Sequence, residues 1–143
     1  MSEKVAQITG ACGEIGQALV QELARQGNYR IVTMDLAPLA TSIGSLSSEH
    51  IQGDLLGKIK YLYDIPIDEI YHLAAFLSSK AELMPEEAHH VNVDGTLQLL
   101  QLAAYKSEKR HQAGKLFFPS SIHSCGSCAA IKRSGLIRII AKR

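Results

Sequence analysis

The sequence has little net charge, few cysteines and no long apolar run, and each of these shortages excludes a class of protein. Its 143 residues carry 15 basic and 14 acidic side chains, a formal net charge of +1, so we expect no binding to nucleic acid or to an anionic membrane. Charges and glycines interrupt every apolar run before it reaches the length of a membrane span. Three cysteines do not make a disulfide framework and the N-terminus has no signal-peptide pattern, so we expect a cytoplasmic protein of one domain.

What the sequence does contain is a glycine pattern near its start. Gly10, Gly13 and Gly16 follow a short apolar run and open a helical pattern that we expect over residues 14–26. The first glycine allows a tight turn, the second lets backbone N–H groups approach a pyrophosphate, and the third lets the helix pack close to the strand. The start of the helix attracts the anion. The pattern therefore predicts a dinucleotide site.

An acidic residue closes the next predicted strand, which covers residues 29–34. Asp35 lies 19 residues after Gly16, where a dinucleotide site places the carboxylate that accepts hydrogen bonds from ribose hydroxyls. Such charge-assisted bonds stabilise by roughly 1.5–3 kcal/mol each, and the same carboxylate repels a 2′-phosphate. Asp35 therefore favours NAD over NADP.

Beyond Asp35 the chain continues to alternate between predicted strands and helices. We expect a loop at 36–48, a strand and turn at 50–55, a short helix at 58–64, a strand at 69–75, a long helix at 85–107 and a strand at 115–118. Strands that alternate with helices predict a parallel sheet with right-handed crossovers.

Several segments, in order, resemble the extended short-chain dehydrogenase/reductase family, the NAD-dependent epimerases and dehydratases. They are Thr9-Gly10-x-x-Gly13-x-x-Gly16, Asp35, Gly53-Asp54-Leu55, His72-Leu73-Ala74-Ala75, Val91-Asn92-Val93-x-Gly95-Thr96 and Ser120-Ser121. The resemblance implies a Rossmann-type α/β fold, a parallel sheet with helices on both faces that is truncated after about the fifth strand. Residues 1–122 would form the NAD-binding domain, and residues 123–143 an atypical basic tail that is not a separate domain.

The resemblance also implies the roles of individual residues. Ser121 would be catalytic, binding the reacting hydroxyl or carbonyl oxygen, and no metal is expected. The implied cofactor contacts are Gly10, Cys12, Gly13, Glu14, Ile15, Gly16, Asp35, Asp54, Leu55, Leu73, Ala74, Ala75 and Asn92.

Within the family, residues 71–80 and 117–122 resemble the short-chain type of L-threonine 3-dehydrogenase. In those enzymes a serine after the fourth strand helps to hold the amino-acid substrate, which implies Ser78 or Ser79 here. A nucleotide-sugar epimerase or dehydratase is the alternative, so the expected substrate is an amino acid or a nucleotide sugar.

Family members commonly dimerise through the helix that we expect at 85–107, which implies a homo-oligomer. We expect this helix to leave an apolar stripe exposed. The stripe consists of Ala88, Val91, Leu99 and Leu102, with Leu97, Leu100 and Ala104 at adjoining positions.

The sequence departs from the family after Ile122. The family uses a Tyr-x-x-x-Lys on the helix after the Ser121 strand, but no tyrosine lies beyond Tyr105, and residues 123–143 do not resemble the family. General acid–base catalysis contributes ~10²–10⁴-fold, so its loss should nearly silence turnover. We interpret the chain as the NAD-binding portion of an oxidoreductase, cut short by truncation or a shifted reading frame and inactive as written. The alternative is a non-catalytic dinucleotide-binding module.

Other motifs have simpler interpretations. Tyr105-x-x-x-Lys109 precedes the serine strand, where a charged helix end is expected. Cys125 and Cys128 have the spacing of a thiol redox pair, a further alternative function, and with His123 they still lack a fourth zinc ligand. We expect His72 to be a packed strand residue.

Overall fold

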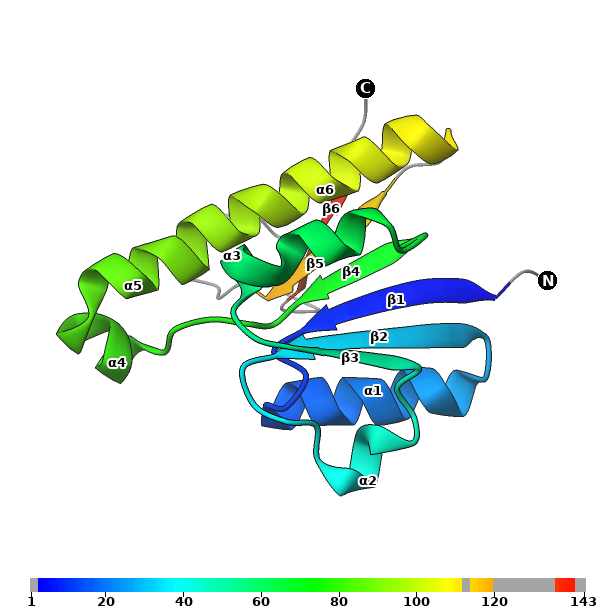
Figure 1. The fold of residues 1–143 in the computed structure, drawn as a ribbon, viewed down its shortest axis with the longest axis horizontal. Coiled ribbons are helices and arrows are strands. Elements are labelled where there is room, and N and C mark those ends of the chain that lie inside the picture. Colours follow the sequence, from blue (N-terminus) through cyan, green and yellow to red (C-terminus); the bar gives the residue numbers. More distant parts are fainter. Residues whose placement is uncertain (1–2, 112–113, 120–135, 141–143) are drawn as a thin grey trace.

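The computed structural model describes residues 3–111, 114–119 and 136–140, which form one sheet with helices on both faces (Figure 1). The strands lie side by side in the order β3-β2-β1-β4-β5-β6. The first five are parallel: β1 (Lys4–Thr9), β2 (Tyr29–Asp35), β3 (Glu49–Gln52), β4 (Glu69–His72) and β5 (Lys115–Pro119). The strand order reverses between β1 and β4, and the carboxyl ends of the strands at such a reversal are where open α/β sheets bind ligands.

The connections between the strands are mostly helical. They are α1 (Glu14–Gln26), α2 (Thr41–Gly44), α3 (Leu55–Lys58), the 3₁₀-helix η1 (Ile59–Tyr63), α4 (Ser78–Leu83), α5 (Pro85–His89), the π-helix η2 (His90–Asp94) and α6 (Gly95–Arg110). Helix α1 occupies the predicted range and ends at Gly27, whose φ of 70° is the left-handed conformation typical of a helix stop. The Asp54 side chain accepts a hydrogen bond from the Gly57 N–H and so starts α3, earlier than the predicted helix at 58–64.

The long helix is a continuous run from α5 through η2 to the end of α6, three residues beyond the predicted end at 107. The π-turn within it, at His90–Asp94, was not predicted, and neither was α4. The predicted strand at 69–75 ends earlier, at His72. Its backbone leaves the sheet because the Ala74 N–H turns to the Thr9 side chain instead of a neighbouring strand.

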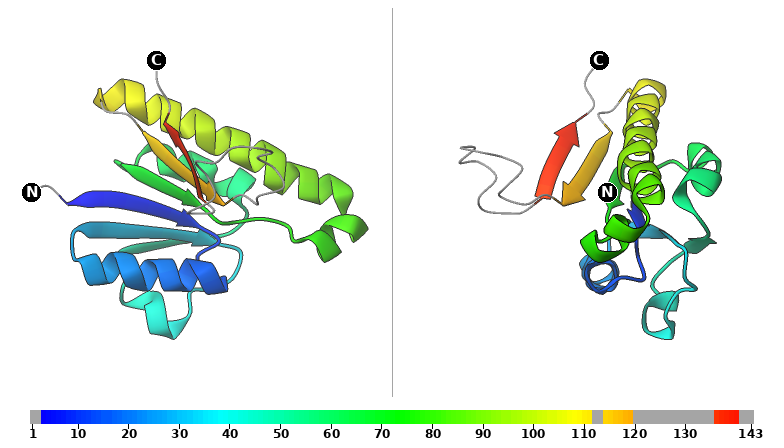
Figure 2. Two further views of the ribbon diagram at one scale, coloured as in Figure 1. Left: turned by 180° about the vertical axis from the view of Figure 1, so that it is seen from behind. Right: turned by 90° about the vertical axis from the view of Figure 1, so that its left-hand side faces the viewer.

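The parallel part of the sheet ends at β5, as predicted, and a sixth strand that sequence reasoning missed extends it. Strand β6 (Leu136–Ile140) pairs antiparallel with β5, with Lys115 opposite Ile140 and Pro119 opposite Leu136. Figure 2 shows this strand at the outer edge of the sheet. Part of the tail at 123–143 therefore belongs to the sheet of the main domain.

Two apolar clusters cover the two faces of the sheet. On one face α3, η1 and α6 pack over the sheet through Val32, Met34, Leu62, Ile70, Leu99, Leu102 and Leu116. On the other face α1 and α2 pack through Ile8, Val20, Leu23, Ile31 and Ile43. Each fully buried aliphatic side chain contributes about 1.5–3 kcal/mol, so these clusters are the main source of stability.

A buried charged group joins four strands at the amino end of the sheet. The Glu69 carboxylate accepts hydrogen bonds from the Tyr29 and Tyr71 hydroxyls, both at 3.0 Å, and from the ammonium groups of Lys115 at 3.2 Å and Lys4 at 3.5 Å. Burial alone would raise the pKa of Glu69, but these donors outweigh it and lower that pKa. The carboxylate therefore stays ionised inside the sheet, although the sequence predicted an apolar strand at this position.

Helix α6 is tied to η1 by a lysine. The buried Lys106 ammonium donates hydrogen bonds to the backbone carbonyls of Tyr63 and Ile65, the latter at 2.6 Å. The Arg110 guanidinium reaches Asp68 at 2.7 Å and the Pro66 carbonyl at 2.8 Å. These contacts hold the end of α6 at the amino edge of the sheet, where β4 begins.

The stripe expected to be exposed on the long helix faces inward instead. Ala88, Leu99 and Leu102 are buried, the two leucines because this side of α6 covers β4 and β5. The expectation that these residues lack a cover is wrong. The exposed apolar side is the adjoining one, with Val93 and Leu97 about half exposed.

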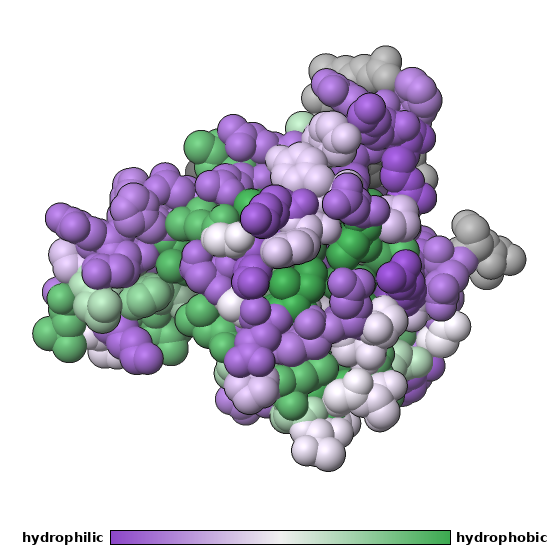
Figure 3. All heavy atoms as spheres, in the orientation of Figure 1, coloured by the Kyte–Doolittle hydropathy of each residue, from purple (hydrophilic) through white to green (hydrophobic). Residues whose placement is uncertain are grey.

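Apolar side chains also gather around α4, at the far end of the molecule from the N-terminus (Figure 3). Leu77 is 73 % exposed and Leu83 is 83 % exposed. Among the residues that the structure describes, no helix is long and apolar enough to cross a membrane.

Candidate functional site

The turn from β1 into α1 is built by two glycines that no other residue can replace without moving backbone. Gly10 has a φ of +71°, and a Cβ atom there would lie 2.6 Å from the Ala74 nitrogen. A Cβ atom at Gly16 would lie 2.3 Å from the Gly10 carbonyl oxygen. These contacts bring the start of α1 and the segment after β4 against the turn. The sequence predicted a tight turn at Gly10 and close packing at Gly16, but not the approach of the segment after β4.

Gly13 differs from its two neighbours in the pattern. Its φ is −68°, which any residue can adopt, and the nearest atom to an added Cβ is the Gly10 oxygen at 3.4 Å. Gly13 is exposed and precedes α1 without a side-chain cap on the first N–H groups of the helix. Packing within the chain therefore does not require a glycine here.

Asp35 and the turn form one site. The Asp35 carboxylate accepts a hydrogen bond from the Cys12 N–H at 2.8 Å through one oxygen, and from the Ala37 N–H at 3.0 Å through the other. An ionised carboxylate has about four acceptor positions, so each oxygen keeps one for a hydroxyl donor. The geometry thus leaves Asp35 half-buried, oriented and able to bind a diol.

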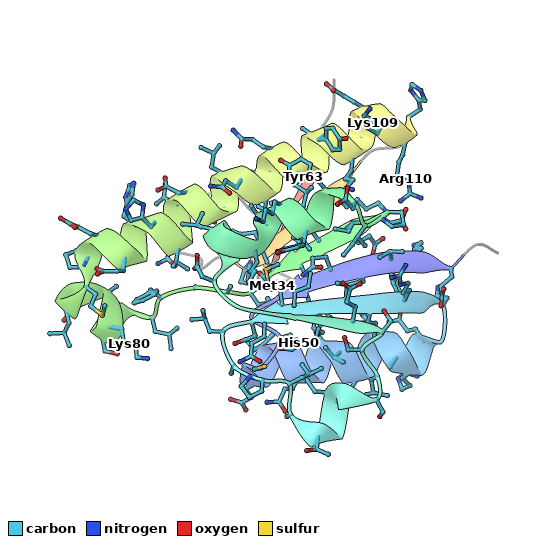
Figure 4. All side chains as sticks on the ribbon, viewed as in Figure 1. Met34, His50, Tyr63, Lys80, Lys109 and Arg110 are labelled. Carbon is cyan, nitrogen blue, oxygen red and sulfur yellow. The ribbon has the colours of Figure 1, made fainter. Side chains whose placement is uncertain are left out.

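The loop after Asp35 is held by side chains from β3 and the turn. His50 lies against the Ala37 carbonyl at 3.1 Å (Figure 4), and Gln52 donates to the Leu36 carbonyl at 3.3 Å. The Cys12 thiol contacts the Ala37 carbonyl at 3.5 Å. Burial, and secondarily the Asp35 charge, raises the pKa of the Cys12 thiol, so it is a structural group and a weak nucleophile.

The Gly53–Leu55 segment lies next to Asp35. The Gly53 N–H donates to the Asp35 backbone carbonyl at 2.8 Å, which brings the exposed Asp54 to this edge. The Leu55 side chain is buried in the core beneath α6. Of the two residues predicted to contact a cofactor, only Asp54 presents its side chain to the surface.

The segment after β4 runs beside the glycine turn. The Leu73 N–H donates to the Thr9 carbonyl at 3.0 Å, which places Leu73, Ala74 and the exposed Ala75 next to Gly10. The side-chain amide of Asn92, on the π-turn, makes two hydrogen bonds to the backbone of one residue. It accepts from the Phe76 N–H at 2.8 Å and donates to the Phe76 carbonyl at 3.2 Å. Asn92 therefore holds this segment in place, which the sequence did not indicate.

The remaining predicted residues are only partly placed. Ile15 is 70 % exposed and Glu14 is exposed at the start of α1, and Ser79 is exposed on α4. Ser121, His123, Cys125 and Cys128 lie outside the described residues. Within the part of the chain that the structure describes, no three histidine, cysteine or acidic side chains gather as a metal site would require.

Tyr105 lies at the other end of the sheet from the turn. Its ring packs on Tyr63 with centroids 5.1 Å apart, and the Lys109 ammonium lies 5.7 Å from the Tyr105 ring centroid. Figure 4 shows Lys109 and Lys80, which marks α4, at opposite ends of the long helical run. The pair at 105 and 109 therefore stabilises a helix end far from the turn.

Comparison with known proteins agrees with this geometry. The family model described as the NAD dependent epimerase/dehydratase family matches residues 6–137. An uncharacterized epimerase/dehydratase of Staphylococcus epidermidis is 30% identical over 126 residues, which are 83% of this chain and 37% of that protein.

Two solved structures are similar to the chain as well. The nucleoside-diphosphate-sugar epimerase of Agrobacterium tumefaciens has a TM-score of 0.73 and 27% identity, over 90% of this chain and 40% of its own. A monomeric L-threonine 3-dehydrogenase from a metagenome has a TM-score of 0.60 and 34% identity, over 82% of this chain and 36% of its own. The chain thus spans less than half the length of these relatives.

The three glycines can be separated by alanine substitution. We expect Gly16→Ala to destabilise the protein by about 3 kcal/mol or more, because its Cβ meets backbone. Gly13→Ala should change the free energy of unfolding by no more than about 1 kcal/mol, since the site is open. Urea unfolding followed by circular dichroism measures both variants. Equal losses would show that Gly13, too, is required only for folding.

Proposed function

We propose, from the premise that this chain belongs to the NAD dependent epimerase/dehydratase family, that it binds NAD across the β1–α1 turn and Asp35. The observation that carries the proposal is the 2.8 Å hydrogen bond from the Cys12 N–H to Asp35, because it joins the pyrophosphate turn and the ribose acid in one rigid site. The residues fit such a ligand: Gly13 leaves space above the start of α1, and both Asp35 oxygens keep an acceptor position.

Each part of the site has a separate task in this proposal. The uncapped N–H groups that follow Gly13 at the start of α1 bind the pyrophosphate, because the Cys12 N–H is held by Asp35. Asp35 binds the adenosine ribose and repels a 2′-phosphate. Asp54 lies beside the adenine, Ile15 covers the outer side, and the backbone of Leu73–Ala75 follows the cofactor toward its reactive ring. The Leu55 side chain is left out of this assignment, because it is buried in the core.

The chemistry that such a site would serve, where a general base is also supplied, is oxidation of a substrate hydroxyl. The chemistry that NAD supplies when bound is acceptance of a hydride from the carbon that carries this hydroxyl. Ser121 binds the reacting oxygen, and Ser78 or Ser79 helps to hold the substrate. The substrate that we favour is L-threonine, which the resemblance of residues 71–80 and 117–122 supports. A nucleotide sugar is the second candidate, supported by the similarity to the Agrobacterium epimerase.

The chain as written lacks the group that would take up the proton. Deprotonation of the hydroxyl calls for a general base, and a serine hydroxyl is a poor one near neutrality. No tyrosine follows Tyr105 in the sequence, and Tyr105 itself packs on Tyr63 at the opposite edge of the sheet with the two rings tilted. We therefore propose that this chain binds NAD without turnover, as a dinucleotide-binding module.

Asp35 should determine the choice of cofactor. We expect Asp35→Ala to weaken NAD binding ~10- to 100-fold through the lost charge-assisted bonds, and NADP binding by much less. Isothermal titration calorimetry of both cofactors measures this, with Asp64→Ala as the control, because Asp64 is an exposed acid after η1. Equal affinity of the parent chain for NAD and NADP would contradict the assignment.

Turnover should be absent from the purified chain. We expect no formation of NADH from NAD and L-threonine, and no epimerisation of a nucleotide sugar, although NAD binds. The absorbance of NADH and product analysis measure the two reactions. A rate near the ~1–10³ s⁻¹ of ordinary enzymes that is abolished by Tyr105→Phe would show that Tyr105 is catalytic after all.

We further propose that the chain forms a homo-oligomer through the long helical run at 85–110. Its exposed apolar stripe consists of Val93, Leu97 and Ala104, at helical spacing on one side of η2 and α6, and the half-buried Leu100 between them packs against the core. This stripe replaces the one expected from the sequence, whose main residues are buried.

A charge in the middle of this stripe should prevent association. We expect Leu97→Glu to shift the chain to monomer in multi-angle light scattering, because the carboxylate would be buried between subunits. Ser42→Glu, which adds the same charge at an exposed position of α2 on the other face of the sheet, is the control. A parent chain that is monomeric at high concentration would refute this interface.

A further inference from the structure

A chain of hydrogen bonds runs through His72, beneath the glycine turn. The imidazole Nδ1 lies 2.8 Å from the Thr9 hydroxyl at the end of β1, and its Nε2 lies 3.0 Å from the Thr96 hydroxyl at the start of α6. The Thr96 hydroxyl in turn lies 2.7 Å from the Asn92 carbonyl oxygen on the π-turn. One buried ring thus connects the strand that opens the turn with the helix that carries Asn92.

The donor and the acceptor of every hydrogen bond in this series follow from its last member, the Asn92 carbonyl. The Asn92 carbonyl can only accept, so the single hydroxyl hydrogen of Thr96 is donated to it. Thr96 must then accept from His72, which places the ring hydrogen on Nε2. The unprotonated Nδ1 accepts from the Thr9 hydroxyl, whose oxygen receives the Ala74 N–H at 3.4 Å.

The two ends of this chain hold the same stretch of backbone. At one end the Thr9 oxygen accepts from the Ala74 N–H, and the Thr9 carbonyl accepts from the Leu73 N–H at 3.0 Å. At the other end the Asn92 amide binds both the N–H and the carbonyl of Phe76. The segment from Leu73 to Phe76 is therefore fixed from below by β1 and from the side by the π-turn.

The surroundings keep the ring neutral and make a lost partner costly. His72 is 1 % exposed, and burial lowers its pKa to about 4. A neutral imidazole has one donor and one acceptor, and both are used here. An N–H group left without a partner at this depth would be strongly unfavourable, so the ring responds to a change at either threonine.

We propose that His72, as the Nε2–H tautomer, is a positioning residue that couples the glycine turn to the π-turn and so fixes the Leu73–Phe76 backbone along the cofactor. The proposal rests on the proposed function, because NAD is the ligand whose path this backbone borders. His72 does not touch the cofactor and acts through Thr9, Thr96 and Asn92.

The tautomer provides a test that needs no cofactor. In ¹⁵N-labelled protein the two ring nitrogens of a neutral histidine have well-separated resonances, and loss of one pair in His72→Gln identifies those of His72. We expect Nε2 to carry the hydrogen in the parent chain. Thr96→Val removes the acceptor, so the hydrogen should move to Nδ1 and face Thr9, while Thr96→Ser should leave it on Nε2. A parent ring protonated at Nδ1 would overturn the proposal without any variant.

The coupling to the site is measured on the same variants. We expect Thr96→Val to lose amide-exchange protection at Phe76 and to bind NAD about tenfold more weakly, which one buried hydrogen bond can account for. Thr96→Ser should restore both, and Thr41→Val, the same change at an exposed position, should alter neither. A tautomer that does not move in Thr96→Val, or unchanged protection and affinity, would overturn the coupling. Should the parent chain not bind NAD, the proposed function fails. The tautomer and exchange measurements still decide whether the hydrogen bonds through His72 couple the two turns.

Discussion

The arrangement of this protein depends on how closely backbone approaches backbone at Gly10. With no side chain there, the end of β1 meets the Ala74 backbone, and with none at Gly16 the first turn of α1 rests on the Gly10 carbonyl. Three segments far apart in sequence thereby converge at the carboxyl edge of the sheet. Asp35, the Leu73–Phe76 segment and the uncapped start of α1 lie together only because these two positions remain glycine.

The parts of the fold and site that the sequence predicted are those with a local signal. The glycine spacing located the turn, Gly27 marked the end of α1, and the apolar strand before Asp35 placed the acid. Five parallel strands and the long helix followed from alternating periodicities. Each of these signals lies within a window of a few residues, so no knowledge of distant partners was needed.

The parts that it did not predict depend on partners distant in the chain. The exposed side chains of α4 give it no apolar period, and β6 forms through pairing with β5, from which sixteen residues separate it in the chain. Glu69 and His72 occur in a strand that its neighbours mark as apolar, and hydrogen-bond partners, most of them from other strands and from α6, make their burial tolerable. Asn92 on the π-turn likewise has its hydrogen-bond partner, Phe76, sixteen residues away.

The antiparallel direction of β6 has a practical consequence for handling the protein. Ile140 pairs with Lys115, and Lys4 pairs with Tyr29, so both ends of the described chain lie at the amino edge of the sheet. The β1–α1 turn and the end of β2, where Asp35 lies, occupy the carboxyl edge (Figure 1). A fluorophore, an affinity tag or a surface linkage placed at either end would therefore leave the proposed nucleotide-binding edge facing the solution, which suits the chain to immobilised binding measurements.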